Sequence, residues 1–275
     1  MDITTNIMLN SGKSMPVLGL GVFQSASQTY NAVRYALAAG YRHIDTASLY
    51  GNEEQVGKAV RDSGIPRGEI FVTTKLWNTE QRSHRQKEAF WESMERLDIS
   101  YIDLYLLHWP VPEAFRESWA VLEELCDGKN LKSIGVSNFL EHHVDELMET
   151  AKIIPAVDQI EVHPYNTKWA LRQYLKEHGI ACEALSPLGR DNKDLITDPV
   201  LASIGQKYGK SAAQVILRWD VQNGIITIPK SVHGERILQN SQIFDFELSS
   251  EEMQQIEALN RNQLHEDPET FCNFF

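Results

Sequence analysis

A regular alternation of short apolar runs with longer segments of helical periodicity extends along nearly the whole chain and constrains its fold more than any other feature. Strands are predicted at 18–20, 41–44, 70–74, 102–107, 133–136, 156–160, 180–184 and 225–228. Helices are predicted at 27–39, 52–62, 80–97, 113–126, 140–150, 167–178, 198–222 (interrupted near Gly209) and 234–241. Eight such units favour an α/β fold that closes into a (β/α)8 TIM barrel over an open doubly wound sheet.

Two further segments lie outside the eight units. Residues 6–17 alternate around the turn-forming Ser11-Gly12-Lys13, which predicts an N-terminal β-hairpin. An extra C-terminal helix is predicted at 249–259. Since the chain has no linker, low-complexity segment or internal repeat, residues 1–275 are predicted to form a single barrel domain.

The composition excludes several classes of protein. A net charge of −12 argues against a nucleic-acid or anionic-membrane partner, because either would favour a basic surface. The three cysteines, at positions 126, 182 and 272, cannot all pair and lack metal-ligand spacing, which favours a reducing compartment and no bound metal. The sequence has neither a signal-peptide pattern nor an apolar run of about 20 residues. A cytoplasmic protein is therefore expected.

Polar side chains stand where successive predicted strands end. Asp45, Lys75 and His108 end three consecutive strands, and Tyr50 lies on the loop after the first of them. The active residues of such barrels lie at the C-terminal ends of the strands, so these four are expected to meet at one mouth. Each has a purely structural explanation when taken alone, such as a buried ion pair for Asp45 and Lys75. Together they match a proton donor, an ammonium that tunes its pKa, a carboxylate that orients the ammonium, and an imidazole that polarises a carbonyl.

A second group of residues indicates an anion site. Lys230, Ser231 and Arg236 stand near the start of the helix that follows the last strand, where cations, a hydroxyl and the helix dipole favour a phosphate. The loop 186–189, after the seventh strand, has a backbone able to approach a pyrophosphate. Gly19 and Gly21 imitate the dinucleotide fingerprint of open sheets, but Gln24 occupies the third glycine position, so that fingerprint fails.

These motifs resemble those of the aldo-keto reductase family, in order and over nearly the full chain. The segments that carry the resemblance are GLGVFQ (19–24), YRHIDTASLYGNE (41–53), TTKLW (73–77), LLHWP (106–110), IGVSNF (134–139), QIEVHP (159–164), SPLGR (186–190) and IPKS…R (228–236). HWP and the short C-terminus are most similar to the microbial and protozoan branch, which includes 2,5-diketo-gluconate reductases, methylglyoxal reductases and prostaglandin F synthases.

The resemblance implies an NADPH-dependent oxidoreductase that reduces aldehydes and ketones, with Tyr50 as the proton donor. It implies that Lys75, paired with Asp45, lowers the pKa of Tyr50, and that His108 orients the carbonyl. The cofactor residues that it implies are Gly21, Val22, Ser137, Asn138, Gln159, Leu185, Ser186, Leu188, Lys230, Ser231, Arg236 and Asn240. Phe23, Trp77 and Trp109 would line the substrate pocket together with His108. The resemblance also favours a monomer with a small-molecule carbonyl substrate.

The chain departs from the family pattern at three places. Leu185 stands where an aromatic residue usually stacks on the nicotinamide, and Gln239 stands where many relatives have glutamate beside the adenine. The C-terminal tail is short, which predicts an open pocket and broad use of aldehydes. Neither the physiological carbonyl nor the strictness of the preference for NADPH over NADH follows from the sequence.

Three other functions stay open at this point. A metal-dependent barrel hydrolase would recruit His43, Asp45, His108, Glu161 and His163. A lyase would use Lys75 as a Schiff-base amine, although a nearby Asp45 would keep that lysine charged. The third function is that of a barrel protein that binds a cofactor without catalysing a reaction, since the fold alone does not establish catalysis.

Overall fold

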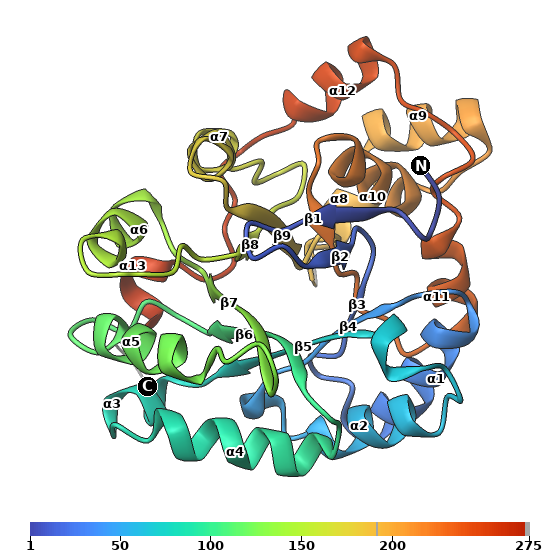
Figure 1. The fold of residues 1–275 in the computed structure, drawn as a ribbon. Helices are drawn as coiled ribbons and strands as arrows, with labels where there is room; N and C mark the ends of the chain where they lie inside the picture. Colours follow the sequence, from blue (N-terminus) through green and yellow to red (C-terminus); the bar gives the residue numbers. More distant parts are fainter. Residues whose placement is uncertain (191, 273–275) are drawn as a thin grey trace.

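Eight parallel strands form one sheet in the computed structural model, which describes residues 1–190 and 192–272 (Figure 1). In chain order they are β3 (Leu20–Gly21), β4 (His43–Asp45), β5 (Phe71–Leu76), β6 (Ile102–Leu107), β7 (Leu131–Ser137), β8 (Val157–Glu161), β9 (Ala181–Leu185) and β10 (Ile226–Thr227). Each strand pairs with the next, and the first and last strands meet through parallel bridges from Leu18 to Thr227 and from Gly21 to Lys230. The predicted (β/α)8 barrel is therefore confirmed.

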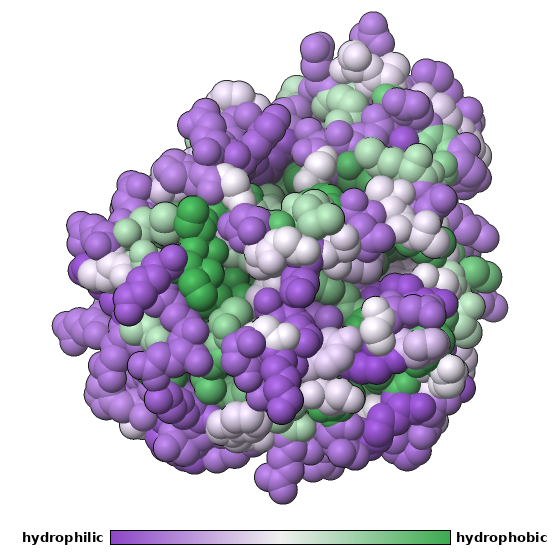
Figure 2. Space-filling model, viewed as in Figure 1, coloured by the Kyte–Doolittle hydropathy of each residue, from purple (hydrophilic) through white to green (hydrophobic). Residues whose placement is uncertain are grey.

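Helices surround the sheet and bury its outer face (Figure 1). The longer ones are α1 (Thr29–Ala38), α2 (Glu53–Arg61), α4 (Gln86–Leu97), α5 (Phe115–Leu125), α6 (Glu141–Met148), α7 (Trp169–Glu177), α9 (Pro199–Tyr208), α10 (Ala212–Gln222), α11 (Gly234–Ser241) and α12 (Ser250–Glu257). The visible outer surface is mostly hydrophilic, as Figure 2 shows. Every helix in the described part of the chain is too short or too polar to cross a bilayer.

The N-terminal hairpin covers one end of the barrel. Its strands β1 (Asn6–Met8) and β2 (Ser14–Pro16) pair antiparallel, as predicted. Leu9 and Met15 pack in one apolar cluster with residues near the starts of several barrel strands. Since the hairpin covers that end, the carboxyl ends of the strands are left to form the open mouth.

The structure divides two of the predicted segments and adds others. The predicted helix 80–97 is two helices, α3 (Asn78–Arg82) and α4, because His84 between them adopts a positive φ of 55°. The stretch 198–222 breaks as predicted at Gly209, which ends α9 with a φ of 65°. Two short helices, α8 (Lys193–Ile196) and α13 (Pro268–Phe271), and the 3-10 turns η1 (Ala26–Gln28), η2 (Ser48–Tyr50) and η3 (Arg67–Glu69) were not predicted.

The close approach of α2 to α4 makes Gly57 irreplaceable. A Cβ at this position would lie 1.7 Å from the backbone oxygen of Leu97, so Gly57→Ala is expected to lower the free energy of unfolding by about 3 kcal/mol. Helix propensity alone would make the alanine variant more stable by about 1 kcal/mol. A loss of stability in Gly57→Ala would therefore show that the steric clash outweighs helix propensity. Urea unfolding measures it, with Gly68→Ala as the control because nothing lies within 4 Å of a Cβ there. An unchanged unfolding midpoint for Gly57→Ala would contradict this packing.

Candidate active site

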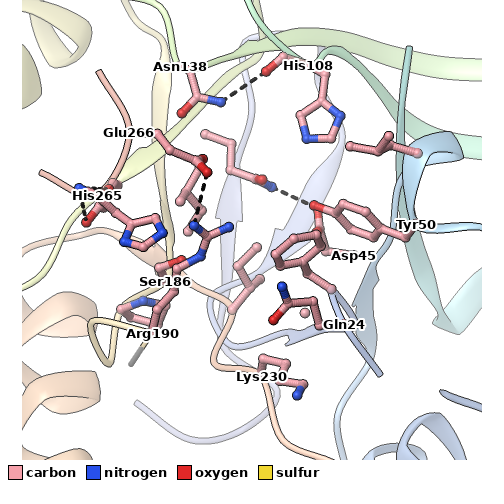
Figure 3. A pocket seen from close by; sticks show the side chains of 18 of the residues that line it. Gln24, Asp45, Tyr50, His108, Asn138, Ser186, Arg190, Lys230, His265 and Glu266 are labelled. Atoms are coloured by element: carbon pink, nitrogen blue, oxygen red, sulfur yellow. Dashed lines mark hydrogen bonds and ion pairs between the residues drawn. The ribbon is translucent and has the colours of Figure 1, made fainter. Parts of the chain in front are cut away.

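A cavity of about 330 Å³ opens at the carboxyl ends of the barrel strands. It is lined by Gly21, Phe23, Gln24, Asp45, Leu49, Tyr50, Trp77, His108, Trp109, Asn138, Gln159, Glu161, Leu185, Ser186, Pro187, Leu188, Arg190, Ile228, Lys230, His265, Glu266 and Phe271. Figure 3 shows Tyr50 and His108 on one side of the cavity, with Ser186, Arg190 and Glu266 across from them. Most of the predicted site residues therefore meet at one mouth.

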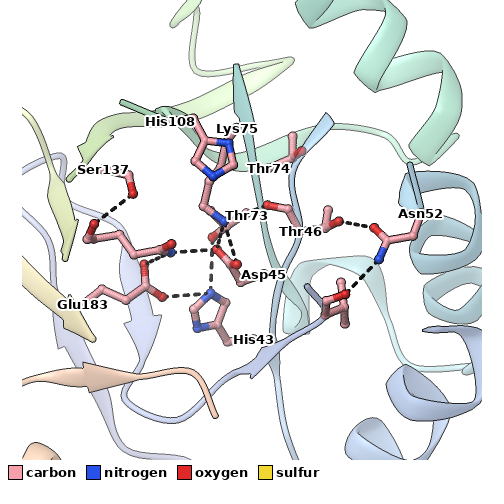
Figure 4. Close-up of polar contacts among 12 residues, drawn as sticks. His43, Asp45, Thr46, Asn52, Thr73, Thr74, Lys75, His108, Ser137 and Glu183 are labelled. Carbon is pink, nitrogen blue, oxygen red and sulfur yellow. Dashed lines mark hydrogen bonds and ion pairs between the residues drawn. The ribbon is translucent and has the colours of Figure 1, made fainter. Parts of the chain in front are cut away.

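Asp45 and Lys75 form a buried ion pair in the wall beneath this cavity (Figure 4). They come from the neighbouring strands β4 and β5, whose register sets Asp45 opposite Thr73. The Lys75 Nζ donates to Asp45 Oδ1 at 2.7 Å, to Asp45 Oδ2 at 2.8 Å and to the Thr46 carbonyl at 2.9 Å. Burial acts to lower the pKa of Lys75, but Asp45, Tyr50 and Glu183 together outweigh it, with Asp45 contributing most, and the net direction of the pKa is upwards. Lys75 is therefore an ammonium at neutral pH.

The ring of Tyr50 lies next to this ammonium. Tyr50 ends η2, which a hydrogen bond from Ser48 Oγ to the Lys75 carbonyl holds against β5. The Lys75 Nζ lies 5.2 Å from the centroid of the Tyr50 ring. Burial raises the pKa of Tyr50, and Lys75 opposes the rise without cancelling it. Lys75 acts on Tyr50 in the predicted direction, but burial of the phenolate outweighs it, so the pKa of Tyr50 is raised overall.

His108 follows β6 and faces the same cavity as Tyr50. The two ring centroids are 5.8 Å apart, and the Trp77 ring stands edge-on to His108 at 5.0 Å. Burial, with a smaller contribution from the Lys75 charge, lowers the pKa of His108 well below its ordinary value. The imidazole is therefore neutral and carries one N–H with which to donate a hydrogen bond.

Two side-chain amides present oxygens to the cavity. Asn138 Nδ2 donates to the His108 carbonyl at 3.0 Å and to Ser137 Oγ at 3.1 Å. Gln159 Nε2 donates to Asp45 Oδ2 and to Glu183 Oε2, both at 2.8 Å. No residue described in the structure donates to the side-chain oxygen of either amide. Both oxygens suit an amide –NH2 group on a ligand.

The predicted phosphate residues extend from the cavity rim onto α11. Lys230 is exposed and lines the cavity, whereas Ser231, Arg236 and Asn240 lie beyond its lining. Ser231 Oγ accepts from the His233 backbone N–H at 3.1 Å, just before α11 begins. Val22 and Ser137 are predicted cofactor residues that are fully buried behind the lining. Ser186 lines the cavity with a positive φ of 48°, in the left-handed region that non-glycine residues adopt infrequently.

The C-terminal segment contributes a wall that the sequence did not predict. Phe271 of α13 packs on Trp109 with ring centroids 4.3 Å apart, and His265 and Glu266 also line the cavity. Arg190 spans the opposite rim and pairs with Glu266 at 3.3 Å. The C-terminal segment therefore lines one side of the cavity although the tail is short. No local pattern in the sequence signals contacts between segments so far apart.

The residues proposed for a metal-dependent hydrolase do not as a set come within metal-ligand spacing of one another, although Asp45, His108 and Glu161 line the same cavity. His43 is buried below the cavity, where burial and then the Lys75 charge lower its pKa to about 3. Glu161 lines the cavity, but it accepts hydrogen bonds from His163 Nε2 and from the His265 backbone N–H. Among the described residues, metal-like spacing occurs at His142, His143 and Glu269, none of which belongs to the proposed set. The lyase alternative is disfavoured because the ion pair with Asp45 keeps Lys75 protonated, whereas a Schiff base needs a neutral amine.

Comparison with known proteins decides the family. Residues 17–261 match the model of the Aldo/keto reductase family. This chain belongs to that family. The resemblance inferred from the motifs is therefore confirmed, and an aldo/keto reductase is an oxidoreductase.

Individual aldo/keto reductases match over almost the whole chain. The 9,11-endoperoxide prostaglandin H2 reductase of Trypanosoma cruzi is 47% identical, covering 96% of this chain and 95% of that protein. The glyoxal reductase of Bacillus subtilis is 46% identical, covering 95% of each chain. The crystal structure of a Bombyx mori aldo-keto reductase in complex with NADP superposes with a TM-score of 0.89 at 36% identity, covering 96% of this chain and 95% of that one.

Proposed function

We propose that this aldo/keto reductase is an NADPH-dependent carbonyl reductase in which Tyr50 is the proton donor. One observation carries the proposal: a buried ammonium, Lys75, lies against the Tyr50 ring at a cavity that a neutral His108 also faces. The related Bombyx mori enzyme was crystallised with NADP, which supports the choice of cofactor.

Four side chains take part in proton transfer, each with a different role. Tyr50 is protonated at neutral pH, since burial raises its pKa, and its O–H protonates the oxygen of the reacting carbonyl. Lys75 stabilises the phenolate that remains, and Asp45 keeps Lys75 charged. His108 donates its N–H to the same carbonyl oxygen, so stabilisation is directed at charge that grows in the transition state.

The residues around the cavity fit a nicotinamide cofactor. When bound, NADPH supplies the hydride that reduces the carbonyl carbon. The side-chain oxygens of Asn138 and Gln159 would accept from the carboxamide –NH2, because their nitrogens are already bonded within the protein. The left-handed backbone at Ser186 would bring the loop close to the pyrophosphate, and Leu185 would contact the nicotinamide in place of the usual aromatic ring.

The wall opposite the cofactor suits small carbonyl compounds with an apolar side. Phe23, Trp77 and Trp109 line it, and Phe271 extends it. We propose small aldehydes, methylglyoxal-type dicarbonyls or keto-sugars as carbonyl substrates. We also propose prostaglandin H2, whose endoperoxide O–O bond would be reduced by the two electrons of NADPH to two hydroxyl groups. Both choices agree with the glyoxal and prostaglandin H2 reductases among the relatives. NADPH oxidation measured against a panel of these compounds tests the proposal. Absence of turnover with every member of the panel would overturn it.

The cations beside α11 are expected to select NADPH over NADH. Lys230→Ala and Arg236→Ala should each weaken NADPH binding by about tenfold or more while changing NADH binding little, because a charge-assisted hydrogen bond to the 2′-phosphate is lost. Fluorescence titration with both nucleotides measures the ratio of their dissociation constants. Arg85→Ala is the matched control, since Arg85 pairs with Glu92 on α4. An unchanged ratio would remove the 2′-phosphate assignment.

A further inference from the structure

Glu183 lies fully buried in the barrel interior, where no motif and no step of the proposed mechanism uses it. It sits on β9, and the register of the sheet places it opposite Gln159 on β8 and Ile226 on β10. Figure 4 shows its carboxyl group turned towards the Asp45–Lys75 pair, with His43 beside it. A carboxyl group is costly to bury without hydrogen-bond partners. The partners of Glu183 therefore indicate its role.

The amide of Gln159 connects Glu183 to the ion pair. One Nε2–H donates to Asp45 Oδ2 and the other to Glu183 Oε2, each at 2.8 Å. Because an ionised Asp45 can only accept hydrogen bonds, the nitrogen of the amide must face it. Glu183 takes the remaining N–H, and Gln159 Oε1 is then turned to the cavity that Gln159 lines.

We propose that Glu183 is a positioning residue of the reductase site, which holds the Gln159 amide with its oxygen facing the nicotinamide carboxamide. This inference rests on the proposed function, since it takes the nicotinamide to lie in this cavity. Glu183 does not itself line the cavity, so it acts through Gln159, which does. Without it, one N–H of a buried amide would lack an acceptor, and Asp45 alone would hold the amide in place.

The charge of Glu183 follows from the groups that face it. These are Asp45 and His43 on β4, Lys75 on β5 and the Gln159 amide on β8. Asp45 already neutralises Lys75, and His43 is itself neutral. Burial and then the Asp45 charge raise the pKa of Glu183 to about 8. Below that pH the group is a neutral acid, and above it a second negative charge would oppose formation of the Tyr50 phenolate.

Two substitutions test the proposal in the full-length enzyme. Glu183→Gln keeps a neutral acceptor of the same shape, so it should keep kcat near neutral pH. It should also remove the decline in kcat that we expect for the parent enzyme above about pH 8. Glu183→Leu keeps the volume but offers no acceptor, so it should weaken NADPH binding by about tenfold, the effect of one lost hydrogen bond. Fluorescence titration and pH–rate profiles measure the two effects.

The outcomes separate this inference from the proposed function. If the parent enzyme reduces carbonyls and the Glu183→Leu variant binds NADPH as tightly as the parent enzyme, the positioning role is refuted. If Glu183→Leu does not fold, the pH profile of Glu183→Gln decides, and an alkaline limb identical to that of the parent enzyme refutes the role. If the parent enzyme turns over no carbonyl at all, the proposed function itself has failed.

Discussion

Tyr50→Phe is expected to lower kcat for carbonyl reduction by about a thousandfold, which is the typical contribution of a positioned general acid. The substitution removes the hydroxyl group and keeps the ring, so the contacts of that ring with Phe23 at 4.9 Å and His108 at 5.8 Å should persist. NADPH binding should therefore stay within a few-fold. Since His108 is neutral and Lys75 is fully engaged, neither can replace the lost proton donor.

Single-turnover kinetics and NADPH titration of the same preparation separate the two effects. Tyr30→Phe is the matched control, because it removes a phenol that donates to Asp62 on the protein surface. That control should leave kcat unchanged. Equal loss of turnover and of NADPH binding in Tyr50→Phe would contradict the assigned role, as would turnover within tenfold of the parent enzyme.

Lys75→Met is expected to abolish turnover and also to destabilise the fold by about 3–5 kcal/mol. The ion pair with Asp45 is almost completely buried, so removal of the ammonium leaves a carboxylate in the barrel wall without a counter-charge. The catalytic loss has a separate cause, since the Tyr50 phenolate would then form beside Asp45 with no cation to stabilise it.

A double substitution distinguishes these two causes. Asp45→Asn combined with Lys75→Met removes both charges, so it should recover much of the lost stability in urea unfolding. It should not recover turnover, because the ammonium beside Tyr50 is still missing. A double variant as unstable as Lys75→Met alone would contradict the pairing, and a double variant that regains activity would contradict the role of Lys75.

Part of the site could be predicted because, in a barrel, strands that follow one another in the sequence lie next to one another in space. Asp45, Lys75 and His108 end consecutive strands, and parallel strands in chain order bring such residues to the same mouth. The helix break at His84 was missed because residues 79–88 are all polar and include no glycine or proline that would mark a break. The C-terminal wall was missed because it depends on the long-range contact between Phe271 and Trp109. The sequence around neither residue indicates that the two rings pack together.

The sequence by itself determined the eight strand–helix units, the barrel, the family and the set of polar residues at its mouth, because local periodicity and strand order carry that information. The tertiary structure alone decided which of those residues carry charge and which atoms they present. Burial leaves the phenol of Tyr50 protonated and the ring of His108 neutral. The pairing of β8 with β9 brings Glu183 to Gln159, whose amide nitrogen donates both to Glu183 and to Asp45. Protonation and amide orientation depend on desolvation and on neighbours from other strands, which only the assembled barrel supplies.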